Sequence, residues 1–175
     1  MKQPATAAET RIVLEALRRV VQALRVTARD AELRHGVSAA QLFVLHLLAR
    51  DGPASVNELA ERSFTHQSSV SVVIARLAAA GLVARDRSTE DRRRAVVALT
   101  SSGRALLRRV PEPAQTRLVA ALASVTATER SALARGLEAL VREMGIADGR
   151  TGMFFEEVTT RRRARSTPPR TRSRR

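Results

Sequence analysis

The chain has 175 residues and a formal net charge of +14, with 44% hydrophobic residues, 2% aromatic residues and no cysteine. This length fits one domain with appendages, and the lack of cysteine excludes disulfides, Cys-based zinc fingers and thiol-based redox sensing. The excess of positive charge indicates a polyanionic partner, of which nucleic acid is the commonest and an anionic membrane surface the main competitor.

The longest apolar run, residues 118–125, is too short to span a bilayer, and the first residues lack the pattern of a signal peptide. We therefore expect a cytoplasmic protein, associated with the nucleoid if its partner is DNA. Eight arginines and no acidic residue lie in residues 161–175, so more than half of the net charge belongs to this end.

The first predicted element is a long amphipathic helix over residues 9–34, preceded by a flexible start at residues 1–8. Apolar residues recur through this helix at helical spacing, and Gly36 ends it. A second helix follows Ser38, which together with Gln41 has the spacing of a capping box. This second helix is apolar almost all round, so we expect it to be buried.

The next segment predicts two helices joined by a three-residue link. Ser55 and Glu58 form another capping box at the start of the first, and Gly81 ends the second. The second helix, over residues 66–80, has one apolar stripe and one face of small, mostly polar side chains. The stripe, which we expect to be buried, consists of Val70, Val73, Ile74 and Leu77, and the opposite face of Gln67, Ser68, Ser71 and Ala75.

After Gly81 the period of the sequence changes from that of a helix to that of a strand. Residues 82–87 and 95–99 predict the two strands of a β-hairpin, and the charged residues 88–94 predict its loop.

Helical periodicity returns after the hairpin. Thr100 is expected to cap a helix, which Pro111 and Pro113 kink or interrupt because proline lacks the backbone N–H. A final helix begins with a capping box of Thr126 and Glu129. The Arg-, Ser- and Pro-rich residues beyond it are expected to be disordered.

This order of elements predicts a helix-turn-helix followed by a wing, with the polar face of the second helix in the major groove of DNA. Gln pairs with adenine, Ser with several bases, and an apolar residue such as Val72 with a thymine methyl group. Flanking side chains would contact phosphates. The expected DNA contacts of this helix are His66, Gln67, Ser68, Ser69, Ser71, Val72 and Arg76. The alternative is an ordinary amphipathic helix with a solvated Ser-rich face.

The hairpin loop carries the second expected contact, made by Asp91, Arg92, Arg93 and Arg94. An arginine at a loop tip can enter the narrow minor groove, where the potential is most negative. A neighbouring aspartate can hold the guanidinium in place through paired hydrogen bonds. The alternative is a solvated turn of mixed charge.

The sequence resembles the MarR family, the multiple-antibiotic-resistance regulators. The matching segments are residues 55–62, 68–71, 76–77, 81–83 and 91–100. The most specific is Asp-Arg-Arg-Arg-Ala-Val-Val-Ala-Leu-Thr at 91–100, which fits the family's wing pattern of Asp-x-Arg, five residues and Leu-Thr. Two departures are Phe64, in a turn where glycine is frequent, and Val72, where many members carry a polar or basic residue.

The resemblance implies a mainly α fold with a small β-hairpin wing: a winged helix-turn-helix over 55–100 and dimerisation helices over 9–35 and 101–145. Together these make one domain over 9–145, followed by an Arg-rich tail at 146–175. It implies a homodimer on double-stranded DNA, with Arg93 in the minor groove and Asp91 bracing it. Many members are repressors released by a small phenolic or aromatic effector bound between the dimerisation helices and the DNA-binding lobe.

Other kinds of site are not indicated. The three histidines, His35, His46 and His66, are not clustered with carboxylates at metal-ligand spacing, and His46 is expected to be a core histidine with its polar atoms satisfied. We find no catalytic or cofactor motif, so we expect that the protein is not an enzyme and that it binds no cofactor or metal ion. A competing function is a nonspecific architectural nucleic-acid-binding protein driven by the Arg-rich tail; a third is a protein-interaction module.

Overall fold

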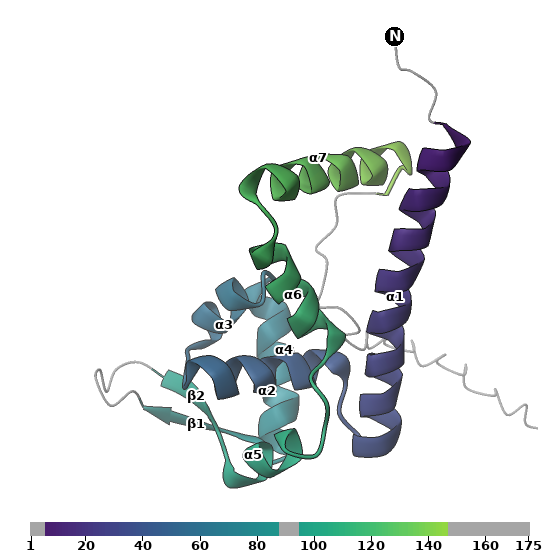
Figure 1. The fold of residues 1–175 in the computed structure, drawn as a ribbon. Coiled ribbons are helices and arrows are strands. Elements are labelled where there is room, and N and C mark those ends of the chain that lie inside the picture. The colour runs from purple at the N-terminus through teal and green to yellow at the C-terminus, as the bar shows by residue number, and fades with distance from the viewer. Residues whose placement is uncertain (1–5, 88–94, 147–175) are drawn as a thin grey trace, which may run out of the picture.

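The computed structural model describes residues 6–87 and 95–146. Its elements in chain order are α1 (Ala7–His35), α2 (Ala39–Asp51), α3 (Val56–Arg62), α4 (Gln67–Ala79), β1 (Val83–Arg87), β2 (Ala95–Leu99), α5 (Ser101–Leu107), α6 (Ala114–Ser124) and α7 (Ala127–Glu143) (Figure 1). The mainly helical fold with one small hairpin is the fold class that the sequence predicts.

Helix starts follow the predicted capping boxes. Ser38, Ser55 and Thr126 each accept the backbone N–H three residues on, and the Gln or Glu at that position accepts the backbone N–H of the cap. A further box, formed by Thr6 and Glu9, begins α1 earlier than the apolar pattern predicts. These contacts depend only on neighbouring residues, so the sequence alone could identify them.

The two prolines break the helix at the predicted place. The first part, α5, ends at Leu107, and α6 begins at Ala114 with Pro113 as its N-cap residue. The start of α6 is buried and tied to α1, because Ala114 N–H donates to Thr27 Oγ1 at 3.4 Å. The break therefore lets the chain change direction between α5 and α6 (Figure 1).

The main core lies between α2, α3, α4 and the hairpin. Most of α2 is buried, as predicted, with Phe43 and Val44 at its centre. The hairpin is antiparallel, with Val83 opposite Leu99. A bridge that the sequence does not predict joins this hairpin to the segment before α3: Ala54 and Val97 exchange two backbone hydrogen bonds, of 3.1 and 2.8 Å.

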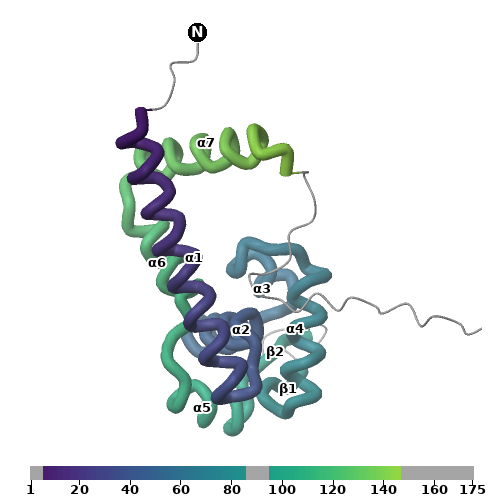
Figure 2. Tube along the Cα trace, turned by 90° about the vertical axis from the view of Figure 1, so that its right-hand side faces the viewer, coloured from purple at the N-terminus to yellow at the C-terminus, as the bar shows by residue number. Residues whose placement is uncertain are grey.

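Helices α1 and α7 reach beyond this core. The second half of α1 packs against α2 and α6, and Leu24 and Ala31 are buried there. Its apolar stripe stays exposed in the first half, where Val13 is 50% exposed. In both views α7 lies far from the hairpin, near the N-terminal end of α1 (Figures 1 and 2). None of the described helices is long and apolar enough to cross a membrane.

Candidate nucleic-acid interface

The apolar stripe of helix α4 packs in the core, and its polar face points away from the core. Its four predicted core residues, Val70, Val73, Ile74 and Leu77, are each at most 1% exposed. They pack in the core shared with α2, α3 and β1. Figure 2 shows α4 on the side of the molecule opposite α1, with α2 between them. The described residues thus leave the outer face of α4 exposed on this side.

The structure brings the predicted contacts of α4 onto one surface. His66, Gln67, Ser68 and Ser71 are exposed, as is Ala75 beside them. Along one edge of this surface, Val72 is 45% exposed, whereas Ser69 and Arg76 are half-buried. Small side chains at the centre allow a helix axis to approach base edges closely, and Gln67 supplies the donor and acceptor that adenine requires.

The start of α4 suits a phosphate. His66 is the N-cap residue by its backbone angles, but its side chain makes no capping hydrogen bond with the described residues. The first N–H groups of an α-helix have no acceptor within the helix and carry partial positive charge. A DNA phosphate at this end would supply the missing acceptor.

The turn before α4 contains a residue that the sequence analysis did not count among the DNA contacts. Phe64 has a φ of +53°, in the left-handed region, and is 80% exposed. The turn is held by its backbone, since Phe64 N–H donates to Glu61 O and Thr65 N–H to Ala60 O, both at 3.1 Å. The signal in the sequence was the phenylalanine at a position where a glycine is frequent in the resembling family.

The base of the hairpin is tied to the end of α4. Thr100 N–H donates to Leu82 O at 3.1 Å, and its hydroxyl donates to Gly81 O at 2.8 Å. The same hydroxyl accepts Gly103 N–H at 3.0 Å and so caps α5. The predicted tip contacts, Asp91, Arg92, Arg93 and Arg94, lie outside the described residues, so their pairing stays a prediction.

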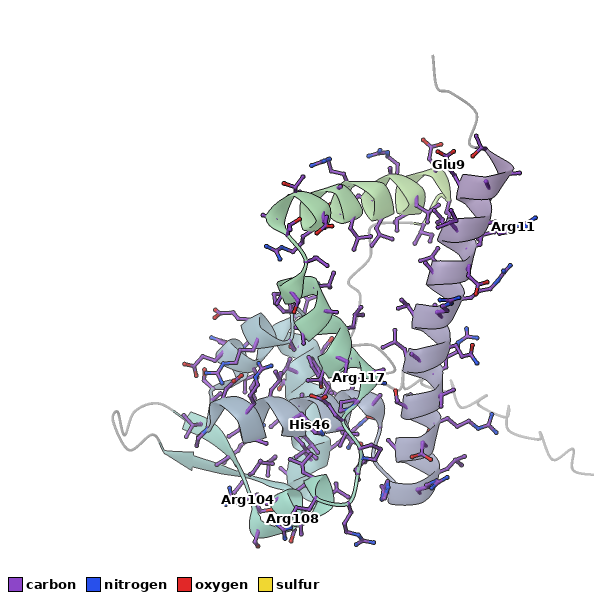
Figure 3. The ribbon with its side chains drawn as sticks, viewed as in Figure 1. Glu9, Arg11, His46, Arg104, Arg108 and Arg117 are labelled. Atoms are coloured by element: carbon purple, nitrogen blue, oxygen red, sulfur yellow. The ribbon has the colours of Figure 1, made fainter. Side chains whose placement is uncertain are left out.

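A second polar site, at the joint between α2 and α6, corrects the expectation for His46. Figure 3 shows His46 on α2 beside the start of α6. Its Nε2 atom is buried and has no hydrogen-bond partner among the described residues, so the packing of these residues does not satisfy it as expected. Burial lowers the pKa of His46, and the carboxylate of Glu112 opposes that shift in part. The neutral imidazole is therefore the form that the fold favours.

The nearby end of α2 carries an ion pair. Arg50 donates two hydrogen bonds to the carboxylate of Asp51, at 2.8 and 2.9 Å, and this contact lowers the pKa of Asp51. Arg62 of α3 lies 3.9 Å from the same carboxylate. This arrangement links α2 to α3 rather than forming a reactive site. Among the described residues, no group of three or more His, Asp or Glu side chains could hold a metal ion.

Comparison with known proteins points in the same direction as the geometry of α4 and the hairpin. The model of the MarR family matches residues 35–94, which include α2, α3, α4 and the first strand. The HTH-type transcriptional regulator YfiV of Bacillus subtilis is 32% identical over 108 residues, 62% of this chain and 68% of its own. The HTH-type transcriptional repressor MdtR of the same organism is 36% identical over 87 residues, 50% of this chain and 56% of its own.

A solved structure supports the same assignment. BpsR of Bordetella bronchiseptica, whose structure concerns the regulation of its DNA binding by 6-hydroxynicotinic acid, has a TM-score of 0.51 and 29% identity. The match covers 83% of this chain and all of BpsR. The related proteins are transcriptional regulators and not enzymes, as the sequence predicts. With a helix-turn-helix, a hairpin wing and relatives of this kind, the chain belongs to the MarR family of winged-helix, DNA-binding transcriptional regulators.

Proposed function

We propose that this regulator is a repressor that binds a pseudo-palindromic operator as a homodimer, with α4 of each protomer in a major groove. The outer face of α4 carries this proposal: its small exposed side chains are centred on Ser68 and Ser71, its hydrogen-bonding Gln67 is exposed, and a rigid apolar stripe lies behind them. Two half-sites about one helical turn apart would match a dimer of such helices. The repressor role is supported by the name of MdtR.

The experiment that tests this face is affinity measurement on a duplex that the wild-type chain selects from a random library. Gln67→Ala should weaken binding by about 1–3 kcal/mol, a factor of roughly 5 to 150, because adenine loses its paired contact. Ser102→Ala is the matched control, since Ser102 is exposed on α5 and is not part of the polar face of α4. Equal affinity of Gln67→Ala and the wild type would exclude this face as the reader of the operator.

The dimer is supported by apolar side chains that α1 and α7 leave uncovered. The exposed ones include Ile12, Val13, Leu14, Val20 and Val21 in the first half of α1, and Leu133, Leu137, Leu140 and Val141 on α7 with Met144 at its end. Exposed apolar side chains gathered on two helices in this way mark an interface. Leu137→Asp should shift sedimentation toward the monomer, whereas Ser131→Asp, on the opposite face of α7, should not. Identical sedimentation of both variants would count against this interface.

The wing contact of the proposal depends on the sequence pattern at 91–94. Arg93→Ala should weaken operator binding and reduce the slope of log affinity against log salt by about one, as expected when one phosphate-type contact is lost. Removing residues 156–175 separates this function from nonspecific coating: a regulator keeps its preference for the selected duplex, whereas a coating protein loses nearly all affinity for any duplex.

Release by a small aromatic effector is the last part of the proposal. BpsR, a structural relative, responds to 6-hydroxynicotinic acid. A panel of aromatic carboxylates and phenols, with this acid included as a probe, can be titrated into the complex of the chain with its selected duplex. A compound that releases the DNA would identify the effector class. If no member of the panel releases the DNA, the effector part of the proposal is wrong, and the proposed DNA binding still stands.

A further inference from the structure

The turn between α3 and α4 exposes a large aromatic side chain without any benefit to folding. Among the described residues, no large hydrophobic side chain is more exposed than Phe64, at 80%, whereas Phe43 in the core is 1% exposed. A ring that stays in water contributes almost nothing to the hydrophobic stabilisation of the fold. Its presence on this surface therefore calls for another explanation.

The backbone conformation at Phe64 also favours another residue. Its φ of +53° is unfavourable for a residue with a Cβ atom and costs a glycine nothing. Two backbone hydrogen bonds, from Phe64 to Glu61 and from Thr65 to Ala60, hold the turn whatever the side chain at 64 is. Glycine would thus serve the turn better, and an unfavourable backbone conformation at an exposed position is typical of functional sites.

The position of Phe64 indicates what the ring contacts. It precedes His66 and Gln67, the exposed residues with which the DNA-facing surface of α4 begins. In helix-turn-helix proteins it is the N-terminal end of the recognition helix that reaches base edges. A phenyl ring cannot pair with phosphate, and the apolar group that the major groove offers it is the C5-methyl of thymine.

We propose that Phe64 is a specificity-determining residue that packs its ring on a thymine methyl group at the edge of the half-site read by α4. This inference rests on the proposed DNA-binding face and adds a base contact made from the turn. Because burying one methyl-sized group contributes about 0.8 kcal/mol, loss of that methyl should weaken binding about fourfold per contact.

The test uses the full chain and duplexes selected from a random library by the wild type and by Phe64→Gly in parallel. We expect the wild type to require a thymine next to the bases read by Gln67, and Phe64→Gly to accept any base there. Replacing that thymine by deoxyuridine removes only the methyl group. It should weaken wild-type binding about fourfold and leave the affinity of Phe64→Gly unchanged.

Two further variants make the test independent of folding. Phe64→Asn removes the ring while keeping a side chain that tolerates the left-handed conformation, and it should behave as Phe64→Gly does. Leu33→Ala removes another exposed apolar side chain, 73% exposed at the end of α1, and should bind as the wild type does. Thermal melting should show Phe64→Gly at least as stable as the wild type.

The outcomes separate this inference from the proposed function. If Phe64→Gly and Phe64→Asn keep the thymine preference and the wild-type affinity while Gln67→Ala loses the duplex, the role of Phe64 is wrong and the α4 face stands. If both Phe64 variants weaken all duplexes equally, the ring acts without reading a base, which also overturns the proposal. If Gln67→Ala also leaves the affinity unchanged, the proposal that the outer face of α4 binds DNA is wrong.

Discussion

Gly103, in the first turn of α5, should not tolerate even a single added methyl group. A Cβ at this position would overlap the carbonyl oxygen of Leu82 and lie 3.0 Å from Leu99 Cδ2. The Leu82 oxygen cannot easily yield, because it accepts the backbone N–H of Thr100 at 3.1 Å. In Gly103→Ala, overpacking of up to about 3 kcal/mol therefore opposes a gain of about 1 kcal/mol in helix propensity.

We expect Gly103→Ala to lower the free energy of unfolding by about 2 kcal/mol and the melting temperature by roughly 4–8 °C. Urea unfolding at one fixed protein concentration measures the change, since association would otherwise alter the apparent stability. The matched control is Gly136→Ala in α7, where no described atom lies within 4 Å of the added Cβ. That variant should gain about 1 kcal/mol from helix propensity alone. A Gly103→Ala protein as stable as the wild type would refute the close approach of α5 to the hairpin.

Four further predictions concern polar groups within the fold and a helix cap. The pKa of His46 is lowered in the fold from its ordinary 6.5, so the unfolded chain binds more protons below that pH. The free energy of unfolding should fall as the pH drops below 6.5 and should stop falling below the pKa of His46 in the folded protein. His46→Gln should lack this pH dependence in unfolding curves measured from pH 7.5 to 5. Identical pH profiles of the wild type and His46→Gln would contradict the prediction. Thr116→Val, which removes a buried hydroxyl without a partner among the described residues, should stabilise the fold by about 1 kcal/mol. Thr27→Val, which removes the acceptor of Ala114 N–H, should destabilise the fold by a similar amount in the same urea assay. A Thr27→Val protein more stable than Thr116→Val would contradict both predictions. Thr100→Ala should cost about 1–2 kcal/mol through loss of the α5 cap, Thr100→Ser should restore most of it, and equal stability of all three proteins would exclude the cap as a stabilising contact.

Features that depend on residues close together in the chain could be predicted from the sequence. The capping boxes at Ser38, Ser55 and Thr126 join residues three apart, and the break at Pro111 and Pro113 follows from missing backbone donors. The buried stripe of α4 and the two strands of the hairpin followed from the period of the apolar residues. The wing pattern at 91–100 indicated the family, which the comparisons then showed.

Features that join distant parts of the chain could be seen only in the folded protein. The bridge between Ala54 and Val97, the close approach of Gly103 to Leu82 and the burial of His46 Nε2 without a partner among the described residues each depend on how elements pack. A helical period shows that a helix has an apolar face but not what covers it. The sequence therefore could not show that Leu24 and Ala31, in the second half of α1, are buried while the apolar stripe of its first half stays exposed. The left-handed backbone of Phe64 was equally hidden, because its side chain favours no such conformation and the surrounding turn imposes it.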